Sequence, residues 1–172
     1  MIKWIGVGFI LFSCGGIGFE MKNKLEKRIE ALRTIKRIIF MLRGEIKYGN
    51  APLGEAFASI GNRMESPYRE FLMETAKEME HLNGTTFQGI WKQMKENYLK
   101  GLPLLKKDWD HLLDFGDHLG YLDKEMQLNT IELYLEQLEE EILSAQGNLK
   151  KNGKLYQSLG IMGGILITIL II

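Results

Sequence analysis

Apolar residues recur every three or four positions through most of the chain, the spacing of helices with one buried face. Such stripes predict helices at about residues 21–48, 53–64, 67–82, 87–98, 105–119 and 124–152. The first stripe is the clearest and consists of Leu25, Ile29, Leu32, Ile35, Ile38, Ile39, Leu42 and Ile46. No run of alternating apolar and polar residues convincingly indicates a strand. The pattern therefore predicts an all-α fold whose middle part is a six-helix bundle.

The breaks between these stripes carry ordinary helix-ending and helix-starting residues. Gly49 ends the first helix, and Pro52 suits the first turn of the second. Ser66 and Pro67 are predicted to cap and start the third helix, and the turn at residues 83–86 to cap the fourth. Leu105 is expected to face the core from the fifth helix.

Both ends of the chain are long and apolar. Residues 2–19 contain one charge, Lys3, and would rise about 27 Å as a helix, close to the thickness of a bilayer's hydrocarbon core. Residues 159–172 carry no charge but would rise only about 21 Å, so residues 155–158 must contribute if this segment spans. We predict transmembrane helices at residues 2–20 and 155–172, flanking a helical bundle at residues 21–154.

Positive charge next to both segments predicts their orientation. The first segment is followed by basic residues and the last is preceded by them: Lys22, Lys24, Lys27 and Arg28, then Lys150, Lys151 and Lys154. The positive-inside rule therefore places the bundle in the cytoplasm and both termini outward. The alternatives for the first segment are a cleaved signal peptide, with Ser13 and Gly15 before the cut, or a lipoprotein processing site at residues 11–14.

Small residues are spaced four apart in both predicted membrane helices, namely Cys14 with Gly18 and Gly160 with Gly164. Such pairs allow helix backbones to approach closely in lipid, so these four residues are candidates for transmembrane packing. The alternative is that glycine is simply common in membrane helices.

Charge is balanced over the 172 residues, with 22 Lys and Arg against 22 Asp and Glu, so nothing indicates a nucleic-acid partner. Within the chain the charge is polarised: residues 22–47 are strongly basic and residues 123–141 strongly acidic. If the two long helices lie side by side they run antiparallel, and their charged faces could pair; the alternative is two solvated faces. A basic helix beside a membrane could also bind anionic lipid.

Catalytic patterns are scarce. The chain has no glycine-rich phosphate loop, and its lone cysteine lies in an apolar segment. His111, Asp114 and His118 share one helical face, but no fourth metal ligand can be identified. Glu78 and His81 form a single Glu-x-x-His, whereas di-metal bundles need two. We predict no catalytic, cofactor or metal site, and a protein that is not an enzyme.

The stretch from Gly116 to Gln127 is the most unusual in the middle of the chain. Gly120 is predicted to end the fifth helix in the left-handed conformation, and Asp123 to cap the sixth. Gln127 has no role in such a corner. It is therefore the residue we would test first for a partner contact.

Four short motifs, in this order and spacing, resemble the stage III sporulation protein AB family of endospore-forming bacteria. They are Phe19–Glu20, Glu45–Phe57, Leu119–Gln127 and Leu155–Ile171, and the resemblance covers essentially the whole chain. The third has the form Leu-Gly-x-x-Asp-x-x-x-Gln, met by Leu119, Gly120, Asp123 and Gln127.

The resemblance implies a place in the channel apparatus between mother cell and forespore, in the mother-cell membrane facing the forespore. It also implies a helical domain similar to the cytoplasmic domain of the platform protein of type II secretion systems. Partners would then be a secretion-type ATPase and other membrane subunits of the channel, with further copies of the chain left open. The expected function is an adaptor that couples the ATPase to the membrane; the alternative is a scaffold that only holds channel subunits.

Overall fold

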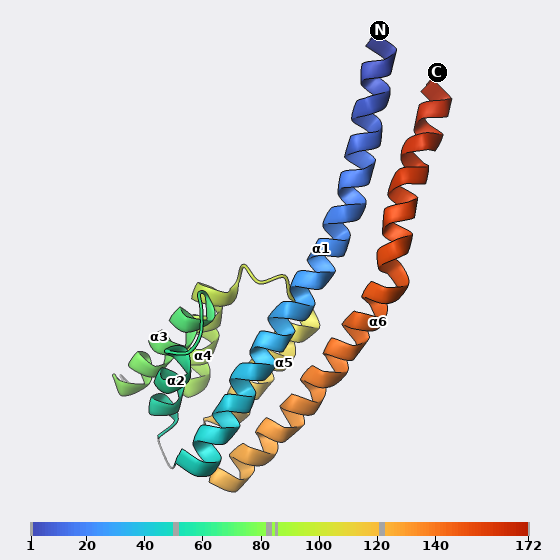
Figure 1. The fold of residues 1–172 in the computed structure, drawn as a ribbon. Helices are drawn as coiled ribbons and strands as arrows, with labels where there is room; N and C mark the ends of the chain where they lie inside the picture. Colours follow the sequence, from blue (N-terminus) through green and yellow to red (C-terminus); the bar gives the residue numbers. More distant parts are fainter. Residues whose placement is uncertain (1, 50–51, 82–83, 85, 121–122, 172) are drawn as a thin grey trace. The chain divides into compact units, whose positions relative to one another are not determined.

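The computed structural model describes the backbone of residues 2–49, 52–81, 84, 86–120 and 123–171. Side chains are described for residues 20–49, 52–81, 84, 86–120 and 123–151. Every regular element in these ranges is helical (Figure 1). The α-helices are α1 (Ile2–Gly44), α2 (Leu53–Gly61), α3 (Tyr68–Glu80), α4 (Phe87–Met94), α5 (Lys106–Leu119) and α6 (Lys124–Ile171). The predicted all-α fold is confirmed, with each helix of the middle part close to its expected place.

Two π-helical segments extend α1 and α4, and the sequence pattern did not predict them. They are η1 (Glu45–Gly49) and η2 (Lys95–Leu99). A π-turn holds more residues than an α-turn, so it shifts the face that the following side chains occupy. Each segment contributes a buried apolar side chain, Ile46 in η1 and Leu99 in η2.

The chain divides into two compact units, one formed by Met1–Glu30 with Glu141–Ile172 and the other by Ala31–Glu140. In the first unit an ion pair joins α1 to α6: Arg28 Nη2 lies 3.1 Å from Glu141 Oε2. Lys22 also pairs with Glu26, one turn away in α1, at 3.6 Å.

Among the residues described with their side chains, no helix is apolar over a length sufficient to span a bilayer. In the predicted transmembrane segments, residues 2–20 and 155–172, every side chain except that of residue 20 lies outside the described ones. The four candidates for transmembrane packing, Cys14, Gly18, Gly160 and Gly164, are therefore not tested. The backbone is nevertheless helical from Ile2 to Gly44 and from Lys124 to Ile171. Each long helix therefore runs without a break from the bundle into an apolar end of the chain.

An aromatic cluster around Trp91 forms the centre of the Ala31–Glu140 unit. Trp91 is 1% exposed, and its ring lies 4.8 Å from Phe71, 5.7 Å from Phe57 and from Phe87, and 6.1 Å from Phe115, between centroids. These rings come from α2, α3, α4 and α5, each of which packs against the next in sequence order. One tryptophan thus joins four helices in a tilted and edge-on packing typical of buried aromatic residues.

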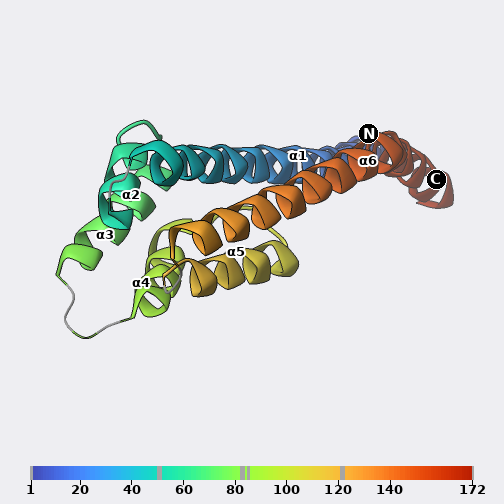
Figure 2. The ribbon, with the colours of Figure 1, turned by 90° about the horizontal axis from the view of Figure 1, so that it is seen from below.

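Ion pairs in the Ala31–Glu140 unit link α1 to α6, which lie side by side there (Figures 1 and 2). Lys36 pairs with Glu139, and Arg43 Nη1 donates to both carboxylate oxygens of Glu132 at 2.9 and 3.0 Å. The α1 partner rises in number as the α6 partner falls, so the helices run antiparallel. The predicted pairing of basic with acidic helix is confirmed.

Helix starts were predicted with mixed success. The Oγ1 of Thr86 accepts a hydrogen bond from the amide of Gly89 at 3.3 Å, as expected of the cap of α4. The predicted cap at Ser66 is wrong, because α3 begins at Tyr68 after Pro67 and has no side-chain cap. The prediction that Leu105 faces the core from the fifth helix is also wrong, because Leu105 precedes α5 and is 48% exposed.

Candidate functional site

The corner between α5 and α6 contains the residues singled out in the sequence. The Oδ1 of Asp123 accepts a hydrogen bond from the amide of Met126 at 2.9 Å. This satisfies one of the amides that have no partner in the first turn of a helix. The prediction that Asp123 caps the last long helix is confirmed.

Gln127 closes the same corner from the other side. Its side-chain Nε2 donates to the carbonyl oxygen of Leu119 at 3.0 Å. Leu119 is the last residue of α5, and the carbonyl groups at the end of a helix have no amide donor within that helix. Gln127 thus ties the first turn of α6 to the last turn of α5. A contact of Gln127 with a partner stays a prediction.

Gly120 does not end α5 in the left-handed conformation, so that prediction is wrong. Its φ and ψ are −77° and −16°, in the ordinary right-handed region. The need for glycine is steric instead: a Cβ here would lie 2.7 Å from Cβ and 2.8 Å from Cδ1 of Phe87. Gly120 is therefore required by a neighbour 33 positions earlier in the chain, which a local turn rule does not reveal.

Gly116, one turn before Gly120, is required for the same steric reason, because it makes room for the side chain of Trp91. An added Cβ would lie 2.1 Å from Cδ1 and 2.5 Å from Nε1 of the indole. The indole Nε1 donates to the carbonyl oxygen of Leu112 at 2.9 Å, a buried hydrogen bond. The two glycines form a groove on α5, and Phe87 and Trp91, spaced four apart on α4, occupy it.

A hollow of about 250 Å³ opens between α5 and α6 beside this corner. It is lined by His111, Asp114, Phe115 and His118 of α5 and by Thr130, Leu133, Tyr134 and Gln137 of α6. The rings of Phe115 and Tyr134 stack beneath it with centroids 4.7 Å apart and an angle of 19°. Leu133 forms one wall and is 63% exposed.

The predicted helical face of His111, Asp114 and His118 is real, because all three line this hollow. The Nδ1 of His118 lies 2.7 Å from the backbone oxygen of Asp114, one turn earlier. In the part of the chain that the structure describes, no three His, Cys, Asp or Glu side chains converge as metal ligands would. The chemistry of the hollow is that of a small, open surface with an apolar base and a polar rim.

The base of the hollow is neutral. Burial, with a contribution from the carboxylate of Asp108, raises the pKa of the Tyr134 phenol far above its usual range. Asp108 is itself buried, and its Oδ2 accepts a hydrogen bond from the amide of Leu105 at 2.8 Å, which caps α5. The sequence pattern pointed to neither residue, because their proximity arises only when α5 and α6 pack.

The whole chain matches a known family. The family model described as stage III sporulation protein AB matches residues 3–172. The chain belongs to the stage III sporulation protein AB family. It is 28% identical over 171 residues to stage III sporulation protein AB of Bacillus subtilis (strain 168), covering 99% of each chain.

The fold of this family member is also that of a solved relative. A solved structure of a stage III sporulation protein AB is similar to it with a TM-score of 0.65 and 24% sequence identity. The match covers 72% of this chain and 96% of the other. The resemblance carried by the four sequence motifs is therefore confirmed. Within the third motif, Asp123 and Gln127 form the corner, and Gly120 makes room for Phe87.

Proposed function

We propose that the chain is a non-enzymatic adaptor of the channel apparatus that endospore formation requires. In this proposal its two ends anchor it in the mother-cell membrane, and its bundle faces the mother-cell cytoplasm. There the bundle couples a secretion-type ATPase to the membrane subunits of the channel. Family membership supports a role in sporulation, since the family and the Bacillus subtilis relative are both named for stage III of that process.

The continuity of the two long helices is the observation that carries the proposal. α1 extends from Ile2 to Gly44 and α6 from Lys124 to Ile171, so each joins bundle residues to an apolar end of the chain without a loop. Unbroken helices are rigid elements that can transmit a displacement along their length. A force applied to the bundle by a bound ATPase would thus reach the segments predicted to lie in the membrane.

Binding is tested with the full-length chain in detergent or lipid nanodiscs. We expect it to retain the secretion-type ATPase of the same apparatus on an affinity matrix and to change the rate of ATP hydrolysis. Failure to bind, by a chain whose helical content and unfolding transition are normal, would contradict the adaptor function. The remaining candidate would then be a scaffold that holds channel subunits without contacting the ATPase.

Coupling is tested separately from binding at Gly147, which lies within α6. A Cβ added there meets no atom within 4 Å, so Gly147→Ala is a matched control. Gly147→Pro removes a helical hydrogen bond and disrupts the helix at a cost of about 3 kcal/mol or more. We expect Gly147→Pro to bind the ATPase yet lose spore formation at normal protein abundance, and Gly147→Ala to form spores normally.

Orientation is tested by cysteine labelling in a Cys14→Ser background. His81 is exposed at the end of α3, so His81→Cys presents a thiol at the surface of the bundle. A membrane-impermeant maleimide should label it only after the cells are permeabilised. Labelling of intact cells would place the bundle outside and remove the basis for ATPase coupling.

A further inference from the structure

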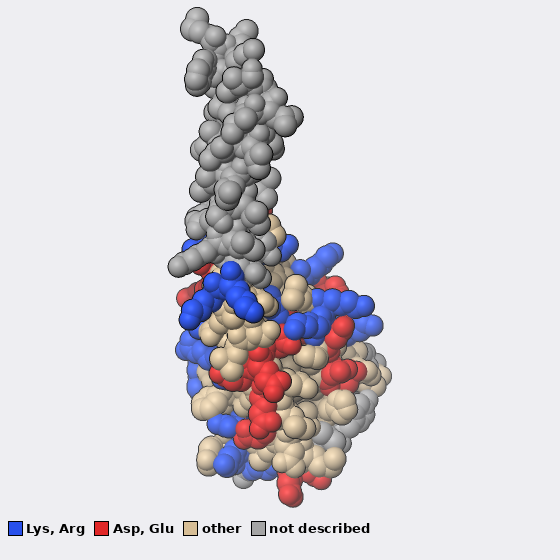
Figure 3. Space-filling model, turned by 90° about the vertical axis from the view of Figure 1, so that its right-hand side faces the viewer, with Lys and Arg blue, Asp and Glu red and all other residues tan. Residues whose placement is uncertain are grey.

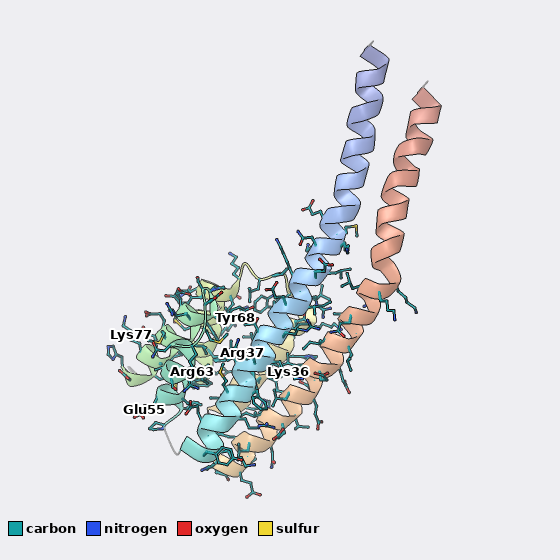
Figure 4. All side chains as sticks on the ribbon, viewed as in Figure 1. Lys36, Arg37, Glu55, Arg63, Tyr68 and Lys77 are labelled. Atoms are coloured by element: carbon teal, nitrogen blue, oxygen red, sulfur yellow. The ribbon has the colours of Figure 1, made fainter. Side chains whose placement is uncertain are left out.

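One face of α1 remains exposed after the helix has paired with α6. It carries Arg33, Arg37 and Phe40, which are spaced four and three apart and so lie along one line of the helix. Phe40 is 56% exposed, and the guanidinium of Arg43 lies 4.5 Å from its ring centre. Arg37 extends from a different side of α1 than its neighbour Lys36, which pairs with Glu139 (Figure 4). We call Arg33, Arg37 and Phe40 the basic stripe.

Neither arginine of the basic stripe has a carboxylate within ion-pair distance in the part of the chain that the structure describes. Large exposed aromatic side chains flanked by arginine are characteristic of protein interfaces, where Trp, Tyr and Arg dominate the binding energy. The basic stripe therefore has the composition of one half of an interface.

The hollow between α5 and α6 has the complementary character. One exposed carboxylate, Asp114 of α5, lines it, and three more are exposed within one helical turn of lining residues: Asp110 on α5, and Glu136 and Glu140 on α6. We call these four carboxylates the acidic rim. Acidic side chains gather on the face of the bundle shown in Figure 3. None of these four carboxylates forms an ion pair with another described residue. His111 and His118 also line the hollow.

The size of the hollow suits a single side chain. Its volume of about 250 Å³ lies below the range of roughly 300–1,000 Å³ that is usual for sites of drug-sized ligands. Its base is the Phe115–Tyr134 stack and one wall is Leu133. An aromatic ring inserted there would contact apolar atoms, while neighbouring arginines would meet the surrounding carboxylates.

The two surfaces of one chain lie apart, because α1, which carries the basic stripe, and α5, which lines the hollow, pack on different sides of α6. One side of α6 is joined to α1 by the Glu132 and Glu139 ion pairs, and another is joined to α5 by the ring stack at Tyr134. The basic stripe is therefore separated from the hollow of its own chain. Only a second molecule can bring the two surfaces together.

We propose that the basic stripe of one copy docks on the hollow of a second copy, with Phe40 inserted between α5 and α6. Arg33 and Arg37 then lie against the acidic rim. Because a different surface is used on each partner, the contact is heterologous, and repeating it produces a ring or an open chain of copies. The proposal does not depend on ATPase binding.

Self-association of the full-length chain in lipid vesicles is the first test, measured by energy transfer between labelled copies at several protein-to-lipid ratios. Phe40→Ala should weaken it at least about 10-fold, as for an anchor residue of an interface. Leu143→Ala is the matched control: Leu143 lies on α6, is also 56% exposed, and belongs to neither surface. Equal self-association of the two variants would overturn the proposal.

Complementation tests the heterologous geometry. Arg37→Glu should weaken association, Glu136→Arg should do the same, and a chain carrying both changes should recover because the charges are exchanged on the two surfaces. A mixture of Phe40→Ala chains with Leu133→Asp chains should form pairs but nothing larger, since only one intact contact remains. Larger assemblies in that mixture would overturn the proposal.

The occupant of the hollow is identified by photocrosslinking. A benzoylphenylalanine at position 40 should crosslink to residues 111–118 or 130–137 of another copy. Crosslinks to α1 of another copy would indicate a symmetric contact and contradict the proposal. Loss of ATPase binding in Phe40→Ala, with self-association unchanged, would assign the basic stripe to the ATPase and equally overturn it.

Discussion

Gly116→Ala should destabilise the bundle although alanine is the better helix former. Gly116 lies within α5, so the substitution alone would favour the helix by about 1 kcal/mol. The new Cβ, however, would lie 2.1 Å from Cδ1 of Trp91, far inside contact distance. The indole is fully buried among aromatic rings, so it cannot move aside into solvent.

The size of the effect follows from two costs. Forcing extra volume into a well-packed core costs about 1–3 kcal/mol. Moving the indole also breaks the hydrogen bond from its Nε1 to Leu112, and a buried donor left without a partner costs about 1–3 kcal/mol. After subtraction of the gain in helix propensity, Gly116→Ala should lower the free energy of unfolding by about 1–5 kcal/mol.

Denaturant unfolding of the full-length chain in detergent, followed by near-ultraviolet circular dichroism, measures this effect. Gly147→Ala is the control, since an added Cβ there meets nothing and should raise stability by up to about 1 kcal/mol. In a Trp91→Ala background, which removes all three clashing ring atoms (Cδ1, Nε1 and Cγ), the cost of Gly116→Ala should largely disappear. Equal stability changes for Gly116→Ala and Gly147→Ala would refute the reasoning.

Substitutions at three further positions test the corner and the hollow by the same unfolding measurement. Asp123→Ala should lower the free energy of unfolding by about 1 kcal/mol through loss of the cap, whereas Asp123→Asn should retain most of it. Gln127→Ala should cost about 0.5–1.5 kcal/mol through loss of the bond to Leu119, and normal stability would contradict that bond. The folded-state pKa of Tyr134 is raised, so its contribution to stability is complete below the ordinary tyrosine value of about 10 and declines as pH rises above it. Tyr134→Phe should therefore lose less stability than the natural chain above about pH 10, and identical pH profiles would contradict the burial of the phenol.

The helices and two of their caps, at Thr86 and Asp123, could be predicted because their signals are local. Apolar spacing every three or four residues locates a helix with one buried face, whichever neighbour it packs against. The cap at Asp123 needs only a side-chain acceptor within reach of a free backbone amide three positions later in the chain. The antiparallel ion pairs needed one further inference. Two long helices of opposite charge, each continuing into a predicted membrane segment, run antiparallel when they lie side by side, so their charged faces can pair.

The features that were missed or misjudged depend on contacts between distant parts of the chain. Gly120 matches a helix terminator in the sequence, but its function is to admit Phe87 from α4. Gln127 had no explanation until Leu119 was seen to lie within reach of its amide. The π-turns η1 and η2 shift the helical face locally, whereas a periodic pattern averaged over several turns does not detect one extra residue.

Charge polarity along the chain serves different purposes at different positions of α1. Exposed ion pairs such as Arg43–Glu132 contribute between 0 and about 1 kcal/mol, so they set the register of α1 and α6 more than their stability. Arg28–Glu141 is more deeply buried, with side-chain exposures of 6% and 16%, and removing one member would leave a charge with little access to water. Arg33 and Arg37 belong to neither group, because they have no ion-pair partner among the described residues. Stability of the isolated chain does not explain them, and an opposite charge on a neighbouring molecule does. The carboxylates of the acidic rim likewise form no ion pair with another described residue. The acidic rim is therefore the surface of this chain that supplies that charge.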